Sequence, residues 1–209
     1  RQRMSYDQVL IPVARVTDLL ETLTWVDAEG EKEQQSPAAA ALAADLTALA
    51  APEEPLFSVH PLQASGEVVF VPAVYPAAQR ARDLVIPRAF AASFAVYDPQ
   101  IDVLLDPRTA VAGRVHTQQF GSFPTLTPGL IDALLGATQN GDFLVAERGD
   151  LWFMQYADNG DTFALEYREG DESQHLAAVV HGVDQISAAL HGWLTGDDAA
   201  YRDLTWEVL

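Results

Sequence analysis

The stretch GDFLVAERGDLWFMQYADNGDTFALEYREGD, residues 141–171, decides the architecture of the last third of the chain. Glycine–aspartate pairs begin at positions 141, 149, 160 and 170, at intervals of 8, 11 and 10 residues. Glycine reaches positive φ at little steric cost, and aspartate stabilises tight turns by bonding its own backbone. The segments between the pairs are rich in aromatic, aliphatic and β-branched residues. This pattern predicts an antiparallel β-meander.

The third strand of this meander has two distinct faces. Glu166 and Arg168 are two residues apart and are expected to share one face, while Leu165 and Tyr167 take the other. The polar face is either a Glu–Arg pair in solvent or part of a contact patch for a basic partner. The turn before this strand is expected at Asn159-Gly160, a strong two-residue hairpin signal.

The rest of the chain mixes helix and strand patterns. Strands are expected at residues 6–13, 56–62 and 67–74, and on both sides of a turn at Asp98-Pro99. Helices are expected near residues 16–23, 37–50, 128–135 and 184–194, with Ser36, Thr127 and Asp184 at the starts of the last three. The proline-punctuated segment 72–87, with Arg80, Arg82 and Arg88, indicates a solvated loop rather than a nucleic-acid contact.

These patterns predict an α+β fold, an antiparallel β-meander packed by helices, in two α+β halves of similar size. The first half is expected at residues 4–108 and starts at Met4, a candidate initiator. A linker-like segment rich in Gly, Gln and Ser follows at 109–125, and the second half covers 126–209. One continuous domain is the alternative.

The chain is strongly acidic. Its formal net charge is −18, and the last 69 residues carry −11 of it, from 14 acidic side chains and 3 arginines. Such a field repels nucleic acid and anionic membranes and favours a basic protein partner. The alternative is that the charge only keeps the protein soluble.

Cysteine is absent, which excludes disulfides, thiol nucleophiles and thiolate metal sites. The sequence has no apolar run long enough to cross a bilayer, and its start lacks the features of a secretory signal. We therefore expect a cytoplasmic protein.

The sequence offers no convincing reactive constellation. His175 and His181 would stand about 20 Å apart on a strand, which is too far for one metal ion. The segment around Gly160 lacks the first acidic ligand of a calcium loop, and nucleophile-elbow and phosphate-loop motifs are absent. Asp98, Asp102 and Asp106 suit turns and hairpin ends better than a pair of catalytic carboxylates. We expect no catalytic residue, cofactor or metal, and hence no enzyme.

The features from Phe143 to Leu209 resemble a family of immunity proteins from bacterial polymorphic toxin systems, which are common in actinobacteria. The resemblance lies in FLVAERGDLWFMQYADNGDTFALEYREG, in His175, in DQISAALHGWLTGDD and in the closing YRDLTWEVL with Trp206 and Glu207. It implies a non-enzymatic protein that binds and inhibits a cognate toxin. An acidic inhibitor suits a basic, nuclease-like toxin.

The expected partner-binding residues are acidic side chains of the meander and its turns: Asp150, Asp158, Asp161, Glu166, Glu169, Asp171 and Glu172. Aromatic residues cluster in the same part of the chain, and one or two on an exposed face would anchor a partner. The main alternative is a secretion-system adaptor or chaperone, which predicts an exposed apolar groove instead of an acidic face.

Overall fold

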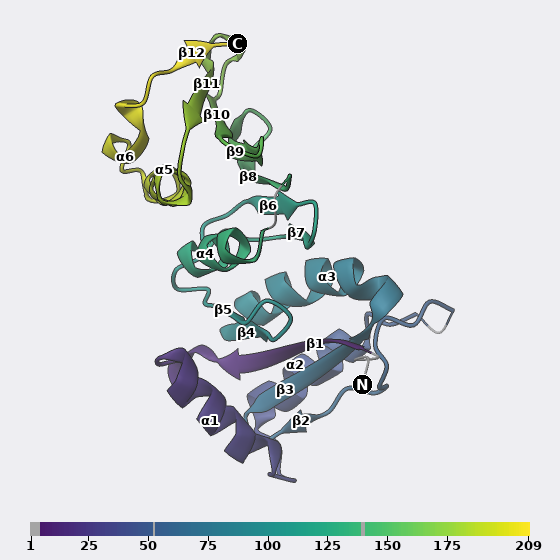
Figure 1. Cartoon of the computed structure of the whole chain (residues 1–209). Helices are drawn as coiled ribbons and strands as arrows, with labels where there is room; N and C mark the ends of the chain where they lie inside the picture. The colour runs from purple at the N-terminus through teal and green to yellow at the C-terminus, as the bar shows by residue number, and fades with distance from the viewer. Residues whose placement is uncertain (1–4, 52, 139–140) are drawn as a thin grey trace. The chain divides into compact units, whose positions relative to one another are not determined.

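The computed structural model describes residues 5–51, 53–138 and 141–209, so Met4 lies outside the described residues. The described part of the chain contains six α-helices and twelve strands, and the strands form two antiparallel sheets (Figure 1). The predicted α+β class is confirmed. The chain divides into two compact units, Arg1–Thr109 and Ala110–Leu209.

The first unit is built on a five-stranded sheet in the order β2-β3-β1-β4-β5. The strands are β1 (Ser5–Pro12), β2 (Ala64–Ser65), β3 (Val68–Val74), β4 (Phe94–Asp98) and β5 (Val103–Leu105). The helices are α1 (Leu19–Gly30), α2 (Pro37–Thr47) and α3 (Ala78–Ala91), with short 3-10 turns η1 (Val13–Arg15) and η2 (Tyr75–Ala77). Ser36 caps α2 by accepting a hydrogen bond from the Ala39 amide at 3.2 Å, as the sequence predicts.

Side chains on the two faces of β1 meet different helices. Val9 and Ile11 pack with Val68 of β3 and with Val26 of α1. The intervening residue, Leu10, points to the opposite face, because neighbouring residues of a strand alternate. That face carries Tyr6, which contacts α3 through Arg82. The sheet therefore separates α1 from α3.

Two expectations for the first unit are wrong. Residues 56–62 form no strand and make only an isolated bridge between Phe57 and Ala73. The segment 72–87 was expected to be a solvated loop, but its residues from Ala78 onward belong to helix α3, which continues through Pro87. Burial explains the helix, since Ala81, Val85 and Ala89 recur every fourth residue and are fully buried. Tertiary packing thus outweighs the hydrogen bond that Pro87 removes.

A polar cluster is buried between β1, β4 and α3. The Tyr6 hydroxyl donates a hydrogen bond to Asp98, and the Arg82 Nε donates to the Tyr6 oxygen at 3.1 Å. All three side chains are at least 94% buried, with exposed fractions of 4%, 1% and 6% for Tyr6, Asp98 and Arg82. Burial and the adjacent Asp98 carboxylate raise the pKa of Tyr6, so the phenol remains a donor. Tyr6 thus bridges a buried acid and a buried base.

Tyr6→Phe is expected to lower the free energy of unfolding by about 1–3 kcal/mol, because it leaves Asp98 and Arg82 without their bridging hydroxyl. The matched control is Tyr75→Phe, since Tyr75 is 55% exposed. Its effect is expected to lie within about 0.5 kcal/mol. Urea unfolding of the three proteins gives both values, and equal stabilities of the two variants would contradict the bridging role.

Asp98 makes the stability of the first unit depend on pH. Burial raises the pKa of its carboxyl above the ordinary value, although the Tyr6 hydrogen bond and Arg82 oppose the shift. The folded state thus binds this proton more tightly than the unfolded state does. The protonated Asp98 carboxyl therefore contributes to stability below the pKa that it has in the unfolded chain, about 3.9. This contribution is lost as the pH rises through its higher pKa in the folded state.

Wild type is therefore expected to lose stability relative to Asp98→Asn as the pH increases from about 4, because the Asn side chain does not ionise. Unfolding free energies of both proteins between pH 4 and pH 7 measure this difference, and the other carboxyl groups cancel in it. A difference that is constant, or that changes in the opposite direction, contradicts the raised pKa.

The second unit is built on a seven-stranded sheet in the order β12-β11-β10-β9-β8-β6-β7. Its strands are β6 (Arg114–Thr117), β7 (Gly121–Phe123), β8 (Phe143–Gly149), β9 (Trp152–Asp158), β10 (Phe163–Glu169), β11 (His175–Val180) and β12 (Glu207–Val208). Its helices are α4 (Pro128–Ala137), α5 (Val183–Thr195) and α6 (Ala199–Arg202), with a 3-10 turn η3 (Glu172–Gln174). Strands β8 to β11 are the predicted meander.

Helices α4, α5 and α6 lie together on one side of this sheet (Figure 1). Helices α4 and α5 each bury an apolar stripe, represented by Leu134 and Leu190, and α6 buries Tyr201. The sheet supplies Met154, Tyr156 and Leu165 to the same core. We call the helix-covered side the inner face of the second sheet and the opposite side the outer face.

The structure differs from expectation at three points of the second unit. The linker-like segment 109–125 contains strands β6 and β7 of the second sheet. The expected cap Asp184 lies in the first turn of α5, while Gly182 occupies the N-cap position. The β9–β10 turn centres on Gly160-Asp161, one residue later than expected, since the Asn159 amide donates to the Thr162 carbonyl at 2.9 Å.

Gly170, in the β10–β11 turn, has a specific structural requirement. Its φ is +86°, and an added Cβ would lie 3.3 Å from three atoms of the Trp152 indole ring. Gly149, from another Gly-Asp pair, has open space around its Cα. The two positions therefore test the role of positive φ within one sheet.

Gly170→Ala is expected to cost about 1–2 kcal/mol of unfolding free energy, because an L-residue is strained in the left-handed region. Gly149→Ala is expected to change stability by no more than about 0.5 kcal/mol. Equal effects at both positions, measured by urea denaturation, contradict this assignment.

Candidate protein-binding surface

The outer face of the second sheet is defined by the alternate residues of its strands. Three pairings connect the four strands of the meander. Glu147 of β8 pairs with Phe153 of β9, Phe153 pairs with Arg168 of β10, and Arg168 pairs with His175 of β11. Because cross-strand partners point to the same side, these residues form one row. The outer face of the meander comprises Phe143, Val145, Glu147, Phe153, Gln155, Ala157, Ala164, Glu166, Arg168, His175, Ala177 and Val179.

A hydrogen-bonded group occupies the middle of the outer face. Gln155 Nε2 donates to Glu166 Oε2 at 2.8 Å, and His175 Nε2 lies 3.0 Å from the same oxygen. The Phe153 ring contacts the His175 ring edge to face, with 5.5 Å between centroids. Glu166 is therefore paired with His175, and the predicted Glu166–Arg168 pair is not formed.

A second aromatic contact lies on the β6–β8 side of the outer face. The His116 ring stands 5.5 Å from the ring of Phe143, and His116 Nδ1 lies 2.8 Å from the Ser122 hydroxyl oxygen. On the opposite side of the meander, Val179 is 65% exposed. The outer face thus combines apolar side chains with polar groups that hydrogen bonds hold in place.

The seven acidic residues predicted to bind a partner do not form one patch. Glu166 lies in the middle of the outer face, and the other six lie at the two ends of the meander. Asp158 is the last residue of β9, and Asp161 lies in the β9–β10 turn. Asp150 and Asp171 lie in turns at the opposite end, where the Gly170 amide donates to the Leu151 carbonyl at 2.8 Å.

Two acidic residues beside the Gly170 turn are already bound within the unit. Glu169 accepts a hydrogen bond from the Tyr201 hydroxyl at 3.1 Å and lies 3.8 Å from Arg202, so it faces helix α6. Burial and the Glu169 carboxylate raise the pKa of Tyr201 to about 12. Glu172 pairs with Arg168 at 3.6 Å. Glu169 is therefore turned away from the outer face.

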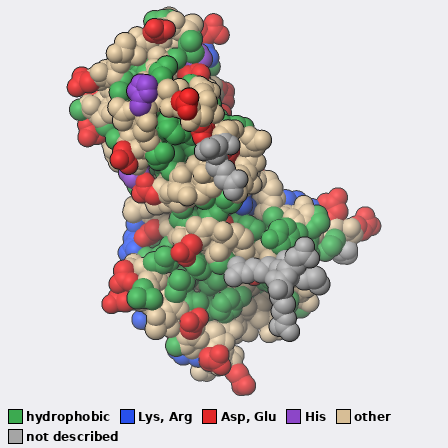
Figure 2. All heavy atoms as spheres, viewed as in Figure 1, with side chains coloured by type: hydrophobic (Ala, Val, Ile, Leu, Met, Phe, Trp, Pro, Cys, Tyr) green, Lys and Arg blue, Asp and Glu red, His purple; other side chains and the backbone are tan. Residues whose placement is uncertain are grey.

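The remaining acidic residues at these turns are more available. Hydrogen bonds from the Ser173 amide and hydroxyl hold the pKa of Asp171 below its ordinary value. Asp150 and Asp161 are exposed and make no ion pair with any residue that the structure describes. Charged groups therefore remain in solvent at both ends of the meander. Carboxylates also outnumber Lys and Arg side chains on the surface visible in Figure 2.

Sequence reasoning missed the side chains that the sheet gathers on its outer face, chiefly Phe153, Gln155 and His175. Strand alternation was the available signal, since Phe153 and Gln155 alternate along β9 with the buried Met154 and Tyr156. His175 required the β10–β11 register, which the sequence does not specify.

The three aspartates considered as catalytic carboxylates each have a different partner. Asp98 is buried against Tyr6, Asp102 accepts a hydrogen bond from the Tyr97 hydroxyl at 2.7 Å, and Asp106 binds Arg108 at 2.6 Å. Within the described ranges, no group of three His, Asp or Glu side chains is arranged to hold a metal ion.

No helix in the part of the chain that the structure describes has the length and apolar character needed to cross a membrane. Comparison of the chain with protein-family models, with curated proteins and with solved structures finds no match. Function must therefore be argued from the surfaces themselves.

Proposed function

We propose that this chain is a non-enzymatic, immunity-type protein that binds and inhibits a basic toxin through the outer face of its second sheet. The observation that carries the proposal is the outer face itself, a broad sheet surface that none of the described helices of the second unit covers and that presents aromatic, aliphatic and hydrogen-bonding groups in fixed positions. As part of this proposal, the protein acts in the cytoplasm.

Charge supports a basic partner. Residues 110–209 carry 15 acidic side chains and 4 arginines, a net charge of −11. Exposed carboxylates such as Asp150 and Asp161 stand at opposite ends of the meander, on either side of the more neutral outer face. Acidic borders of this kind accelerate encounter with a basic protein, while affinity comes mainly from the central contacts.

The central contacts would come from the outer face. Phe153 is half-buried and is held by its edge-to-face contact with His175, so little side-chain entropy is lost when a partner covers it. Val179 is largely exposed and gains burial on binding. Aromatic side chains near the centre of an interface are frequent hot spots. Phe153 is therefore the expected anchor.

An adaptor function is the second candidate, and one observation in the first unit favours it. An apolar hollow of about 470 Å³ lies between α2 and α3. Its walls include Ala38, Ala41, Ala91 and Phe94. A groove between two helices suits an amphipathic helix of a partner.

The first test is co-expression of the tagged chain with the product of the neighbouring gene, followed by size-exclusion chromatography. The immunity proposal predicts a stable complex with a basic protein whose toxicity the chain suppresses. Absence of a complex, or a neighbour without toxic activity, contradicts the proposed function.

Calorimetry with that partner then tests the surface. Phe153→Ala and Val179→Ala are each expected to weaken binding, by about tenfold or more for Phe153→Ala. Leu20→Ala is the matched control, since Leu20 is 77% exposed on α1 of the first unit and lies outside the proposed surface. A tight complex with unchanged affinity in both outer-face variants would refute the surface while leaving the function intact.

A further inference from the structure

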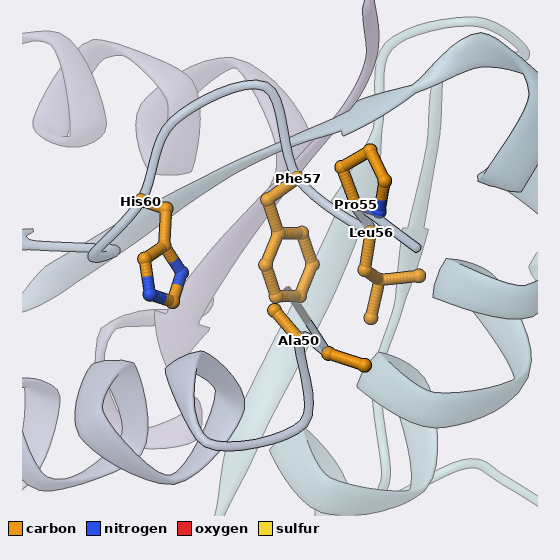
Figure 3. Close-up of a pocket in the computed structure, with 6 residues that line it drawn as sticks. Ala50, Pro55, Leu56, Phe57 and His60 are labelled. Atoms are coloured by element: carbon orange, nitrogen blue, oxygen red, sulfur yellow. The ribbon is translucent and has the colours of Figure 1, made fainter. Parts of the chain in front are cut away.

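The first unit contains a cavity of about 260 Å³, lined by Ala50, Ala51, Pro55, Leu56, Phe57 and His60 (Figure 3). Leu56 and Phe57 are 0% and 5% exposed, so they offer a ligand almost no surface. His60 is the one polar side chain in this lining. The cavity therefore does not select one ligand chemistry, whereas the hydrogen-bonded group on the outer face of the second sheet does.

Glu166, in the middle of the outer face, has one carboxylate oxygen that is bonded and one that is not. Gln155 Nε2 and His175 Nε2 lie 2.8 Å and 3.0 Å from Oε2, and no described residue donates a hydrogen bond to Oε1. The Glu166 side chain is 26% exposed, and Oε1 is not among the buried atoms that lack a partner. Oε1 is therefore an acceptor within reach of a bound partner.

The two neighbours of Glu166 also present acceptors. A carboxylate only accepts, so Gln155 bonds it through the amide nitrogen, and His175 carries a hydrogen on Nε2. The Gln155 oxygen and, in a neutral ring, His175 Nδ1 then remain as acceptors. Apart from the second amide hydrogen of Gln155, the unpaired polar atoms of this group accept hydrogen bonds. The complementary chemical group is one that only donates.

The charges around this group favour a cation. Glu147 of β8 stands beside Phe153 in the neighbouring row, is exposed and makes no ion pair with any described residue. Arg168 belongs to the same row, but its guanidinium lies 3.6 Å from Glu172, in the turn after β10. The charges of Glu147 and Glu166 are therefore not neutralised by an arginine or lysine of the described chain.

We propose that Phe153, Gln155 and Glu166 form a subsite for an arginine side chain of the basic partner. This inference rests on the proposed function, because the subsite is part of the outer face. A guanidinium has N–H donors in a planar fork and no acceptor. It bridges Oε1 of Glu166 and the Gln155 oxygen, which belong to side chains that are bonded to each other. Its plane packs on the partly exposed Phe153 ring as a cation–π contact.

N-acetylargininamide is the probe, and N-acetyllysinamide, which carries the same charge, is its control. Each is titrated into the full-length, ¹⁵N-labelled protein at constant ionic strength. The arginine probe is expected to shift the side-chain amide resonance of Gln155 and the backbone amides of Phe153 and Glu166 first. Its affinity is expected to exceed that of the lysine probe at least about twofold, because only the guanidinium forks and stacks.

Two variants that remove the same charge separate the subsite from the general field of the protein. Glu166→Gln is expected to weaken binding of the arginine probe at least about threefold, because the charge-assisted hydrogen bond is lost. Glu33→Gln is the matched control and is expected to leave the affinity unchanged. Glu33 is an exposed residue of the first unit that makes no ion pair with any described residue.

Phe153→Leu tests the stacking contact. It keeps an apolar side chain in place and is expected to remove the preference for the arginine probe over the lysine probe, because leucine has no ring face for a cation.

The subsite is overturned if the two probes bind equally well to wild type, if Glu166→Gln binds the arginine probe as wild type does, or if the probe shifts only resonances outside the outer face. The complex with the co-expressed neighbour tests the proposed function separately. A toxin complex without arginine binding would refute the subsite alone, and arginine binding without such a complex would refute the function alone.

Discussion

The antiparallel register of the four meander strands is the constraint on which the second unit depends. Because residues two apart share a face, this register sends Met154, Tyr156 and Leu165 to the helices and leaves Phe153, Gln155 and Glu166 on the outer side. A shift of one residue in any strand would exchange the two sets. The buried core and the proposed binding surface therefore have a single origin.

The two units use similar elements in different ways. In the first sheet α1 packs on one face and α3 on the other, and the buried bridge from Tyr6 to Asp98 and Arg82 ties two strands to a helix. In the second sheet the described helices of that unit pack on one side only. The first unit therefore offers a small cavity between loops, and the second offers a broad surface.

Local signals in the sequence predicted much of this fold. The Gly-Asp turns located the meander, and the hydroxyl caps at Ser36 and Thr127 marked two helix starts, where each accepts the expected amide hydrogen bond. Helix α3 was missed because the prolines of segment 72–87 indicated a loop, whereas the burial of residues such as Val85 depends on a sheet formed by distant strands.

The candidate site was less predictable for the same reason. Acidic residues of the meander were selected by charge, but charge does not report direction, and Glu169 is turned toward α6. The group formed by Gln155, Glu166 and His175 depends on the pairing of three strands. Alternation in the sequence indicates which residues of one strand share a face. Only the register shows which residues of neighbouring strands lie beside them.

Hydroxyl-radical footprinting with and without the co-purified partner tests whether the outer face is the binding surface, because it reports the exposure of each reactive side chain. In the free protein, Phe153 and His175 are expected to be labelled, while the fully buried Met154 is protected despite its reactive sulfur. Addition of the partner is expected to protect Phe153 and His175. Labelling of both that is unchanged in a saturated complex would contradict the assignment of the outer face as the binding surface.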